Sequence, residues 1–448
     1  MPFIPMTDEN RKEMLRTIGV SKFEELLETI PSEARFKGEL DLPPPLSEYE
    51  VTKLLKEIAE KNEHTGTYIC FLGGGVYDHF IPAAVDHIIS RSEFYTAYTP
   101  YQAEVSQGTL QAIYEYQTLI ANLTGMDVAN ASMYDGASAL AEAALLAQVH
   151  TKREEILLSK TVHPFYRKVV KTYCHRSGLI VKEIEDKDGL TDLVQLQSII
   201  SDKTAGVLIQ HPNFFGNLEE VDKIEEIVHG AGGLYIVSVD PISLGIFKPP
   251  GEFGADVAVG EGQVLGNSLY FGGPYVGLFA IRESLIRRLP GRLVGVTKDS
   301  KGRRGFVLTL QTREQHIRRE KATSNICTNE QLCALASTVY LSLMGEKGLP
   351  AVANLCLQKA HYLAKKIEKE IDGINLLFPH PFFKEFVIQC SVSPQRIIDE
   401  MRKEKIFAGI DLSRFDYGIN NGLLIAVTEK RTKEEMDQYV GVLKEIVS

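Results

Sequence analysis

Several features that define particular classes of protein are missing from this chain of 448 residues. It has only six cysteines, and none lies in a Cys-x-x-Cys pair or at a His/Cys spacing typical of zinc sites. It has no run of about eighteen apolar residues, so we expect no membrane span, and its first residues lack the apolar core of a signal peptide. Scattered cysteines in a large chain indicate reduced, mostly buried thiols, so we expect a cytoplasmic protein with no metal site.

Positive charge is also scarce. The chain has 49 Lys and Arg against 59 Asp and Glu, a formal net charge of −10, and its basic residues are spread along the sequence. This balance argues against binding to nucleic acid or to an anionic membrane surface. The composition is otherwise ordinary for a globular protein, with 44% hydrophobic and 24% charged residues, and the length allows two or three domains of roughly 150 residues each.

Residues 1–65 predict a helical arm. Apolar residues recur at helical spacing in short stretches that begin near Thr7, Ser21 and Leu46, and three consecutive prolines at 43–45 form an extended spacer before the last stretch. The arm has too little apolar surface to form a core of its own. We therefore expect it to lie against another domain or a partner chain.

Strands and helices alternate from residue 66 to residue 322. The strands, such as those at 233–240 and 255–262, are continuously apolar rather than alternating. Continuous apolar strands separated by helices are typical of a mostly parallel sheet that helices cover on both faces, in an α/β fold. Residues 323–448 combine long helices with two apolar strands and a last helix, which predicts a smaller C-terminal α+β domain.

Several strand ends carry residues that could bind a ligand, because ligands of open α/β sheets bind beyond the carboxyl ends of the strands. At the start of a helix, Asp135-Gly136 and Ser138 could bind a phosphate through backbone N–H groups and a hydroxyl. Ordinary helix capping needs the same residues. His163, which precedes Pro164, could stack on a planar ring or be a structural histidine.

Asp240 ends an apolar strand. Its carboxylate could pair with the pyridinium nitrogen of a cofactor, or it could cap the loop before Pro241. A glycine-rich strand end follows at Gly260–Gly262, where the backbone needs positive φ or a close approach. The order of a phosphate-type turn, a histidine, an aspartate and a glycine-rich strand end matches the plan of fold-type-I pyridoxal phosphate (PLP) enzymes, so it predicts that fold.

Three long segments make a resemblance more specific. Residues 93–143, 259–280 and 291–332 closely resemble the P protein of the glycine cleavage system, for example in the stretches EFYTAYTPYQAE and VGEGQVLGNSLYFGG. The resemblance extends from the arm to the last helix. In many prokaryotes this P protein is split into two homologous subunits, and a fused P protein would be about twice as long as this chain. The resemblance therefore implies the N-terminal, or alpha, subunit of the split form.

The resemblance also shows that one residue is missing. In the beta subunit of the family a His-Lys pair binds PLP through the lysine, but this chain has Gln263 and Val264 at the matching positions. Val264 cannot form a Schiff base. Lys248 lies only eight residues after Asp240, and Lys298 lies beyond a further strand, so neither has the spacing of the missing lysine.

Without that lysine, we expect the chain to bind no cofactor covalently. The resemblance implies that the partner beta subunit holds the PLP. Ser138, His163 and Asp240 are then best interpreted as a vestigial pocket, an inherited architecture that no longer holds a cofactor. The family implies a heterotetramer of two alpha and two beta chains, and an isolated alpha chain could instead form a homodimer through the same face.

One hydroxyl-rich stretch could complete the partner's active site. Tyr95, Tyr98 and Tyr101 surround Pro100, which favours a loop. Three converging hydroxyls would suit recognition of a glycine carboxylate or of an arriving lipoyl arm. The alternative is an aromatic cluster that packs the arm onto the large domain.

A second candidate is the loop between the large and the small domain. By resemblance to this fold, Thr323, Ser324 and Asn325 would reach the cofactor phosphate of the partner subunit. The alternative is a cap for the helix expected from Asn329. Both roles use the same hydroxyl and amide groups, so the sequence leaves them open.

The resemblance implies a function for the complete P protein. It decarboxylates glycine with PLP and transfers the aminomethyl group to the lipoyl arm of the H protein, whose disulfide is reduced in the step. The alpha subunit is expected to be inactive alone and to complete the site in trans. Two alternatives stay open: a non-catalytic scaffold for the beta subunit, and a stand-alone PLP decarboxylase or transaminase that uses an unrecognised lysine.

Overall fold

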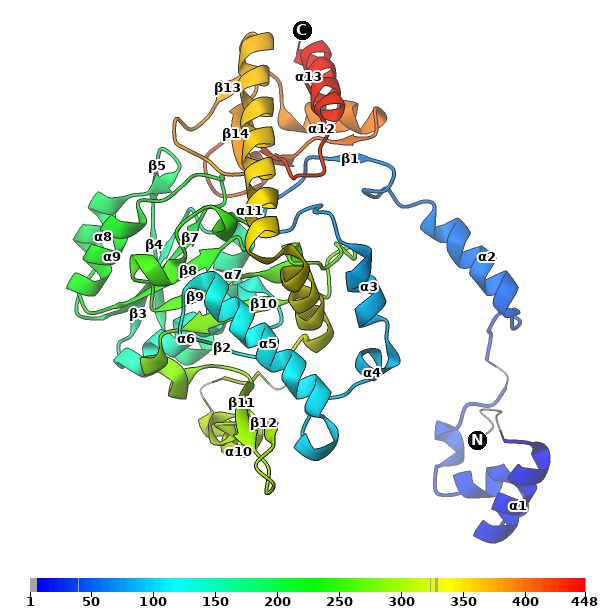
Figure 1. The fold of residues 1–448 in the computed structure, drawn as a ribbon. Helices are drawn as coiled ribbons and strands as arrows, with labels where there is room; N and C mark the ends of the chain where they lie inside the picture. The colour runs from blue at the N-terminus through cyan, green and yellow to red at the C-terminus, as the bar shows by residue number, and fades with distance from the viewer. Residues whose placement is uncertain (1–5, 39, 323, 327–328, 448) are drawn as a thin grey trace. The chain divides into compact units, whose positions relative to one another are not determined.

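The computed structural model describes residues 6–38, 40–322, 324–326 and 329–447 (Figure 1). The chain divides into two compact units, one up to Glu63 and one from His64 onward. Thr323, one of the residues predicted to reach a partner subunit, lies outside the described residues.

The first unit is helical, as the sequence predicts. Thr7 accepts a hydrogen bond from the Asn10 N–H and Ser47 accepts one from the Glu50 N–H, so a capping box begins each α-helix. Among the described residues of this unit none is buried, which agrees with the prediction that it has no core of its own. Its elements are α1 (Asp8–Ile18), η1 (Phe23–Leu27), η2 (Ser32–Ala34) and α2 (Glu48–Ala59).

A mostly parallel sheet is the centre of the second unit. In the described chain it has seven strands in the order β2-β10-β9-β8-β7-β3-β4. The four pairs from β9 to β4 are parallel, whereas β10 is antiparallel to both of its neighbours. The strands are β2 (Val128–Ala129), β3 (Glu155–Ser159), β4 (Ile180–Ile184), β7 (Thr204–His211), β8 (Leu234–Val239), β9 (Val257–Glu261) and β10 (Gly277–Ile281).

Helices cover both faces of this sheet. Alternate residues of the same strand enter two different cores: Ile236 packs with α6 and α7 on one face, while Tyr235 and Val237 pack with α5, α9 and the first half of α11 on the other. This two-sided burial explains the continuously apolar strands. The covering helices are α3 (Ala83–Ile89), α5 (Gln107–Thr124), α6 (Gly136–Thr151), α7 (Pro164–Ser177), α8 (Leu193–Ile199), α9 (Val221–Gly230) and α11 (Gln331–Glu370).

The C-terminal part of this unit, predicted as a smaller α+β domain and called the C-terminal domain below, combines helices with an antiparallel sheet. Helix α11 bends at Gly345, where φ is 56°, and its second half packs beside α13 (Figure 1). The two helices and α12 cover an antiparallel sheet in the order β13-β14-β17-β16. The elements are β13 (Asn375–Leu376), β14 (Glu385–Gln389), α12 (Pro394–Lys403), β16 (Ile410–Asp411), β17 (Gly422–Ala426) and α13 (Lys433–Val447).

One extended segment joins the two sheets. Strand β1 (Ile69–Cys70) pairs in parallel with β15 (Ile406–Phe407), and the chain then enters the core of the large sheet, where Tyr77 is buried. We name residues 73–80 the pocket segment. The remaining elements are α4 (Ser92–Tyr95), β5 (Asp186–Lys187), β6 (Leu190–Thr191), β11 (Leu293–Lys298), β12 (Arg304–Thr309) and α10 (Gln315–Arg318).

Two expectations about the whole chain can be compared with this fold. The cysteines that the structure describes are all buried free thiols: Cys70, Cys174, Cys333, Cys356 and Cys390. Cys327 lies outside the described residues. Within the described chain, none of the helices combines the length and the apolarity needed to span a bilayer.

Candidate functional site

Two of the three residues predicted to form a vestigial pocket, His163 and Asp240, line one small cavity, whereas Ser138 is not part of its lining. His163, Asp240 and Val264 line it, together with Tyr77 and Glu261, at the carboxyl ends of the parallel strands. Its volume is about 20 Å³. A single water molecule needs roughly 10–15 Å³ on the same scale, so the cavity has room for about one water. The place where this fold would hold a cofactor is therefore almost completely filled by the chain itself.

The helix that begins beside Ser138 has its first N–H groups already bonded. The Ser138 N–H donates to Asp135 Oδ1 at 2.6 Å, and the Ser138 hydroxyl lies 3.2 Å from the Asp135 nitrogen, which is a capping box. The Gly136 N–H donates to Glu261 Oε2 at 3.0 Å. The capping interpretation of Ser138 therefore describes its contacts, and carboxylate oxygens fill the anion site of α6.

Glu261 is the buried group that occupies this helix end. Its second oxygen accepts hydrogen bonds from the N–H groups of Gln263 at 3.0 Å and Val276 at 3.4 Å. Burial raises the pKa of Glu261 to about 8, while the hydrogen bond from Gly136 acts in the opposite direction. Glu261 thus supplies acceptor oxygens at the point where a phosphate would otherwise accept the same N–H groups.

His163 binds the pocket segment and not an added ring. Its Nε2 lies 2.6 Å from the Gly74 carbonyl oxygen, and its Nδ1 accepts from the Phe165 N–H at 3.1 Å. These partners place the imidazole proton on Nε2. Burial lowers the pKa of His163 to about 4, so the ring is neutral near pH 7. A Cβ at Gly75 would lie 3.3 Å from this ring, which shows that backbone packs against the imidazole.

Asp240 is paired with a lysine from the C-terminal domain. Lys384 Nζ lies 2.7 Å from Asp240 Oδ2, and the lysine side chain is only 1% exposed. The other oxygen, Oδ1, accepts from the Ile242 N–H at 3.0 Å, which is the loop-capping role considered for this residue. Lys384 Nζ also lies 3.5 Å from the centre of the Tyr77 ring. Both carboxylate oxygens of Asp240 are therefore occupied within the chain.

The two positions of the missing His-Lys pair have structural roles. Val264 is buried at the end of the 3₁₀ helix η6 (Gly262–Val264). Gln263 Oε1 accepts from the Tyr77 N–H at 2.9 Å, and its Nε2 donates to the Tyr77 carbonyl at 3.2 Å. The amide of Gln263 thus holds Tyr77 in the cavity through both of its backbone groups.

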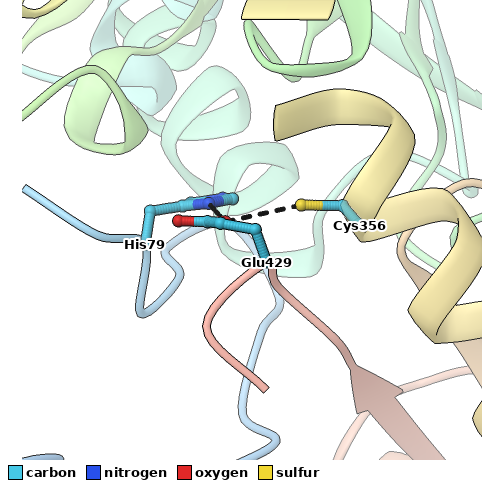
Figure 2. A group of neighbouring side chains, drawn as sticks. All are labelled: His79, Cys356 and Glu429. Atoms are coloured by element: carbon cyan, nitrogen blue, oxygen red, sulfur yellow. Dashed lines mark hydrogen bonds and ion pairs between the residues drawn. The ribbon is translucent and has the colours of Figure 1, made fainter. Parts of the chain in front are cut away.

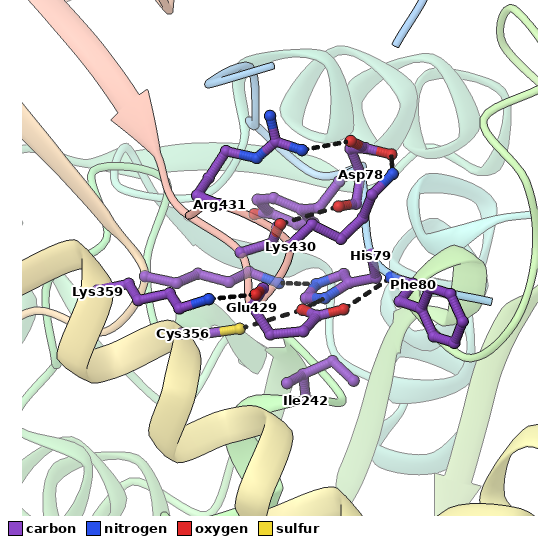
Figure 3. A network of polar contacts seen from close by, with 12 residues as sticks. Asp78, His79, Phe80, Ile242, Cys356, Lys359, Glu429, Lys430 and Arg431 are labelled. Atoms are coloured by element: carbon purple, nitrogen blue, oxygen red, sulfur yellow. Dashed lines mark hydrogen bonds and ion pairs between the residues drawn. The ribbon is translucent and has the colours of Figure 1, made fainter. Parts of the chain in front are cut away.

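A buried polar network ties the pocket segment to the C-terminal domain (Figure 3). Glu429 accepts from His79 Nδ1 at 2.6 Å and from the Phe80 N–H at 2.7 Å. Asp78 pairs with Lys430 at 2.6 Å and with Arg431 at 3.2 Å. Because each carboxylate has two partners, the loop after β17 and the end of the pocket segment are fixed to each other.

One part of this network has the donor atoms of a metal site (Figure 2). One ligand atom each of His79, Cys356 and Glu429 lie within 4.8 Å of one another. Lys384 Nζ lies 3.0 Å from His79 Nε2, and an ammonium group can only donate, so Nδ1 carries the imidazole proton toward Glu429. A metal on Nδ1 would turn an N–H toward that ammonium. The donor atoms of the cluster are therefore bonded to one another without a metal: His79 Nδ1 and the Cys356 thiol both donate to Glu429, the thiol at 3.5 Å.

The three tyrosines predicted to meet a ligand lie away from this cavity. Tyr95 ends the short helix α4, where a loop was predicted, and Tyr98 is 78% exposed. Tyr101 is half exposed, and its hydroxyl accepts from Arg292 Nη2 at 3.2 Å. Their convergence on a ligand stays a prediction.

The domain-junction loop also lies apart from the cavity. Ser324 accepts a hydrogen bond from the Ile326 N–H at 3.2 Å and lines a separate cavity of about 20 Å³ beside Arg313. Asn325 is exposed. Their contact with a partner's cofactor stays a prediction as well.

Two residues of the site were missed in the sequence. Tyr77 comes shortly after the run Gly73-Gly74-Gly75, and Lys384 directly precedes Glu385, the first residue of the mainly apolar strand β14. Three glycines in a row indicate a backbone that passes very close to other atoms. A charged pair at the start of an apolar strand indicates buried ionic partners elsewhere in the chain. Either signal indicates a tightly packed or buried position, but neither identifies the distant residues that fill the pocket.

Comparisons with known proteins identify the family of the chain. The family model described as glycine cleavage system P-protein matches residues 1–443. A protein of Chloroherpeton thalassium, named probable glycine dehydrogenase (decarboxylating) subunit 1, is 55% identical over 446 residues, which cover 100% of both chains. The crystal structure of a glycine decarboxylase (P-protein) of the glycine cleavage system, in inhibitor-bound form, has 43% identity and a TM-score of 0.93 and covers 100% of both chains.

More distant structures confirm the predicted fold type. A C-DES mutant with glycine covalently linked to its PLP cofactor has 15% identity and a TM-score of 0.62, covering 86% of this chain and 98% of its own. At that identity the likeness shows the fold alone. With the family match over nearly the whole sequence, the chain belongs to the glycine cleavage system P-protein family.

Proposed function

We propose that this chain is the non-catalytic alpha subunit of a decarboxylating glycine dehydrogenase, and that a homologous second subunit carries the PLP. The observation that supports this most directly is the filled pocket, with Lys384 on Asp240 and no amine at Val264. The name of the Chloroherpeton relative, subunit 1, implies a further subunit.

The residues of the pocket do not fit PLP. The cavity of about 20 Å³ cannot accept a ring and a phosphate. The Gly136 N–H at the start of α6 already donates to Glu261, and Asp240 already binds Lys384. Lys384 is not a substitute for the missing lysine, because its amine lies at the carboxylate that would pair with the ring nitrogen. A stand-alone PLP enzyme is therefore disfavoured, and the chemistry of PLP, which stabilises the electrons left by decarboxylation, is assigned to the partner.

In this proposal the chain contributes residues to the active site of the partner subunit. Tyr95 and Tyr98 present exposed hydroxyls that can meet glycine or the lipoyl arm of an H protein. Ser324 and Asn325, together with Thr323 before them in the sequence, are the proposed contacts to the phosphate of the partner's cofactor. The proposed assembly is a heterotetramer of two alpha and two beta chains. A pure scaffold is the second candidate, since the exposed hydroxyls are also compatible with an interface that touches no substrate.

The exchange of the glycine carboxyl group with labelled CO₂ in the presence of lipoylated H protein tests the proposal. The alpha chain alone should be inactive, and the mixture with the beta chain should be active. Exchange by the purified alpha chain alone would contradict it. If the beta chain alone were as active as the mixture, the contribution in trans would be excluded and only the scaffold role would remain.

A further inference from the structure

The pocket offers two fixed electrostatic features to any occupant. At one side the N-terminal N–H groups of α6 require acceptor oxygens. At the other side the carboxylate of Asp240, at the end of β8, requires a cation. The ring of His163 lines the same cavity and is the flat group on its wall. An occupant therefore needs acceptors at one end, a positive charge at the other and a flat group in the middle.

The chain supplies the acceptors from its own strand β9. Glu261 accepts the Gly136 N–H at 3.0 Å and is buried. The fit is close, because a Cβ at Gly136 would lie 2.7 Å from the Tyr166 hydroxyl and 2.9 Å from the Glu261 nitrogen. No additional group can reach this N–H unless Glu261 leaves.

The chain supplies the positive charge from its C-terminal domain. Lys384 Nζ lies 2.7 Å from Asp240 and 3.0 Å from His79 Nε2, and its third neighbour is the face of the Tyr77 ring at 3.5 Å. These three contacts surround an ammonium group that is almost completely removed from water. A cation can persist there only because the Asp240 carboxylate offsets its lost hydration.

The pocket segment supplies the flat group. The Tyr77 ring lines the cavity, its hydroxyl donates to Glu385 Oε2 at 2.7 Å, and Gln263 holds its backbone on both sides. The Gly74 carbonyl accepts a hydrogen bond from His163 Nε2, and a Cβ at Gly75 would lie 3.3 Å from the same edge of the ring, so the segment contacts the ring at that edge. The occupant of this pocket is thus a piece of the chain that is itself held by at least two other segments.

Glycine at the start of the pocket segment makes this insertion possible. A Cβ at Gly73 would lie 2.3 Å from Glu385 Oε1 and 2.5 Å from the Ala426 Cβ. A Cβ at Gly74, whose φ is +70°, would lie 2.7 Å from Ile410 Cδ1. Side chains at these positions would push the segment out of the pocket.

We propose that Tyr77, Glu261 and Lys384 form an internal ligand, which reproduces within the chain the pattern of acceptor, ring and cation that a pyridinium phosphate would bring. The internal ligand closes the pocket and joins the C-terminal domain to the large sheet without any cofactor. The proposal concerns this chain alone, so its test does not depend on the function of a partner.

Binding of pyridoxamine phosphate to the full-length chain tests the proposal, because this compound has the ring and the phosphate but no aldehyde to react with surface lysines. The wild-type chain should show no saturable binding in calorimetry. The variant Tyr77→Ala/Lys384→Ala should bind pyridoxamine, and adding Glu261→Ala should make the phosphorylated form the tighter ligand by about tenfold or more. The matched control is Tyr114→Ala/Lys403→Ala, which removes the same residue types at positions that touch neither the pocket nor the pocket segment, and it should not bind.

Saturable binding by the wild-type chain would overturn the proposal, and so would folded opened variants that bind neither compound. A second measurement uses the wild-type chain, so it tests the proposal even if the Tyr77→Ala/Lys384→Ala variants do not fold. The chain is treated with pyridoxal phosphate and borohydride, and the labelled lysines are mapped by mass spectrometry. Exposed lysines such as Lys403 should be labelled and Lys384 should not, whereas labelling of Lys384 in the folded chain would contradict an internal ligand.

Discussion

The ammonium group of Lys384 lies 2.7 Å from the carboxylate of Asp240, although the lysine directly precedes β14 of the C-terminal sheet and the aspartate ends β8 of the large sheet. The lysine side chain is 1% exposed and the aspartate side chain is 11% exposed. This ion pair is therefore shielded from water, and each member depends on the other for compensation of its charge.

Replacement of Lys384 by methionine should lower the free energy of unfolding by about 3–5 kcal/mol, because it leaves Asp240 buried without its cation. The double variant Lys384→Met/Asp240→Asn should recover a large part of this loss. Denaturant titration followed by circular dichroism measures both. Lys430→Met is the matched control: Asp78 keeps Arg431 as a partner, so the loss should be well below that of Lys384→Met. Equal losses for the two lysines would contradict the special role of Lys384.

Glu261 predicts a dependence of stability on pH. Its pKa in the folded chain is raised to about 8 by burial, above the ordinary value of 4.5. Between these two values the folded state binds more protons than the unfolded state, so the contribution of Glu261 to stability is present below pH 4.5 and is lost as the pH rises toward 8.

The variant Glu261→Gln isolates this effect, since glutamine does not titrate. Its free energy of unfolding should be less dependent on pH between about 5 and 8 than that of the wild type. Glu185→Gln, which changes an exposed carboxyl group, should leave the wild-type slope unchanged. An unchanged slope in Glu261→Gln would show that the carboxyl group is ionised throughout this range.

Introduction of a lysine by Val264→Lys should not restore covalent capture of PLP. The side chain at 264 faces a cavity of about 20 Å³ that Tyr77 and its neighbours fill. After treatment with pyridoxal phosphate and borohydride, a peptide map should show no stoichiometric label at position 264. The same substitution in the Tyr77→Ala/Lys384→Ala background is the positive control, in which a label at position 264 is expected. Full labelling in the single variant would mean that the pocket opens readily.

The exposed tyrosines predict a loss of activity without a loss of assembly. Tyr95→Phe and Tyr98→Phe, each reconstituted with the beta chain, should lower the glycine–CO₂ exchange rate while the complex keeps its size in gel filtration. One hydrogen bond lost from the site corresponds to about 1 kcal/mol, or roughly fivefold in rate. Tyr49→Phe removes an exposed hydroxyl of α2 as a control. Full activity of both Tyr95→Phe and Tyr98→Phe would favour the scaffold.

The cluster of His79, Cys356 and Glu429 predicts an absence of metal dependence. Addition of zinc or of a chelator should not change the midpoint of thermal unfolding, because Lys384 keeps the imidazole proton on the side of Glu429. The variant Lys384→Met removes this restriction. A stabilisation by zinc in the wild type would show that the cluster binds metal.

The sequence was sufficient for the features that depend on local pattern. Continuous apolar strands predict the parallel sheet, and the residue types at 163 and 240 mark strand ends that meet at one cavity. Each of these signals lies within one short segment, so periodicity and residue type are enough to find it. The absence of an amine at 264 follows instead from the resemblance to the P protein, which gives the position where a lysine is expected.

The filling of the pocket could not be predicted in this way. It depends on Tyr77, Glu261 and Lys384, which lie far apart in the chain and meet only when the C-terminal domain is in place. The glycine run before Tyr77 and the charged pair Lys384-Glu385 are local signals of close packing and burial, but they do not identify the partners. Spatial pairing over such separations follows from tertiary packing, which a single sequence does not reveal.

The three glycines that begin the pocket segment have a consequence for the history of the chain. Because backbone and a tyrosine occupy the place of a coenzyme, a single substitution that returned the lysine would not restore binding of the cofactor. Intermediate variants on the way back to an open pocket would bury a charge without its partner, and such variants would be less stable. Each residue that fills the pocket therefore makes the recovery of a cofactor site less accessible, because several substitutions would be needed together.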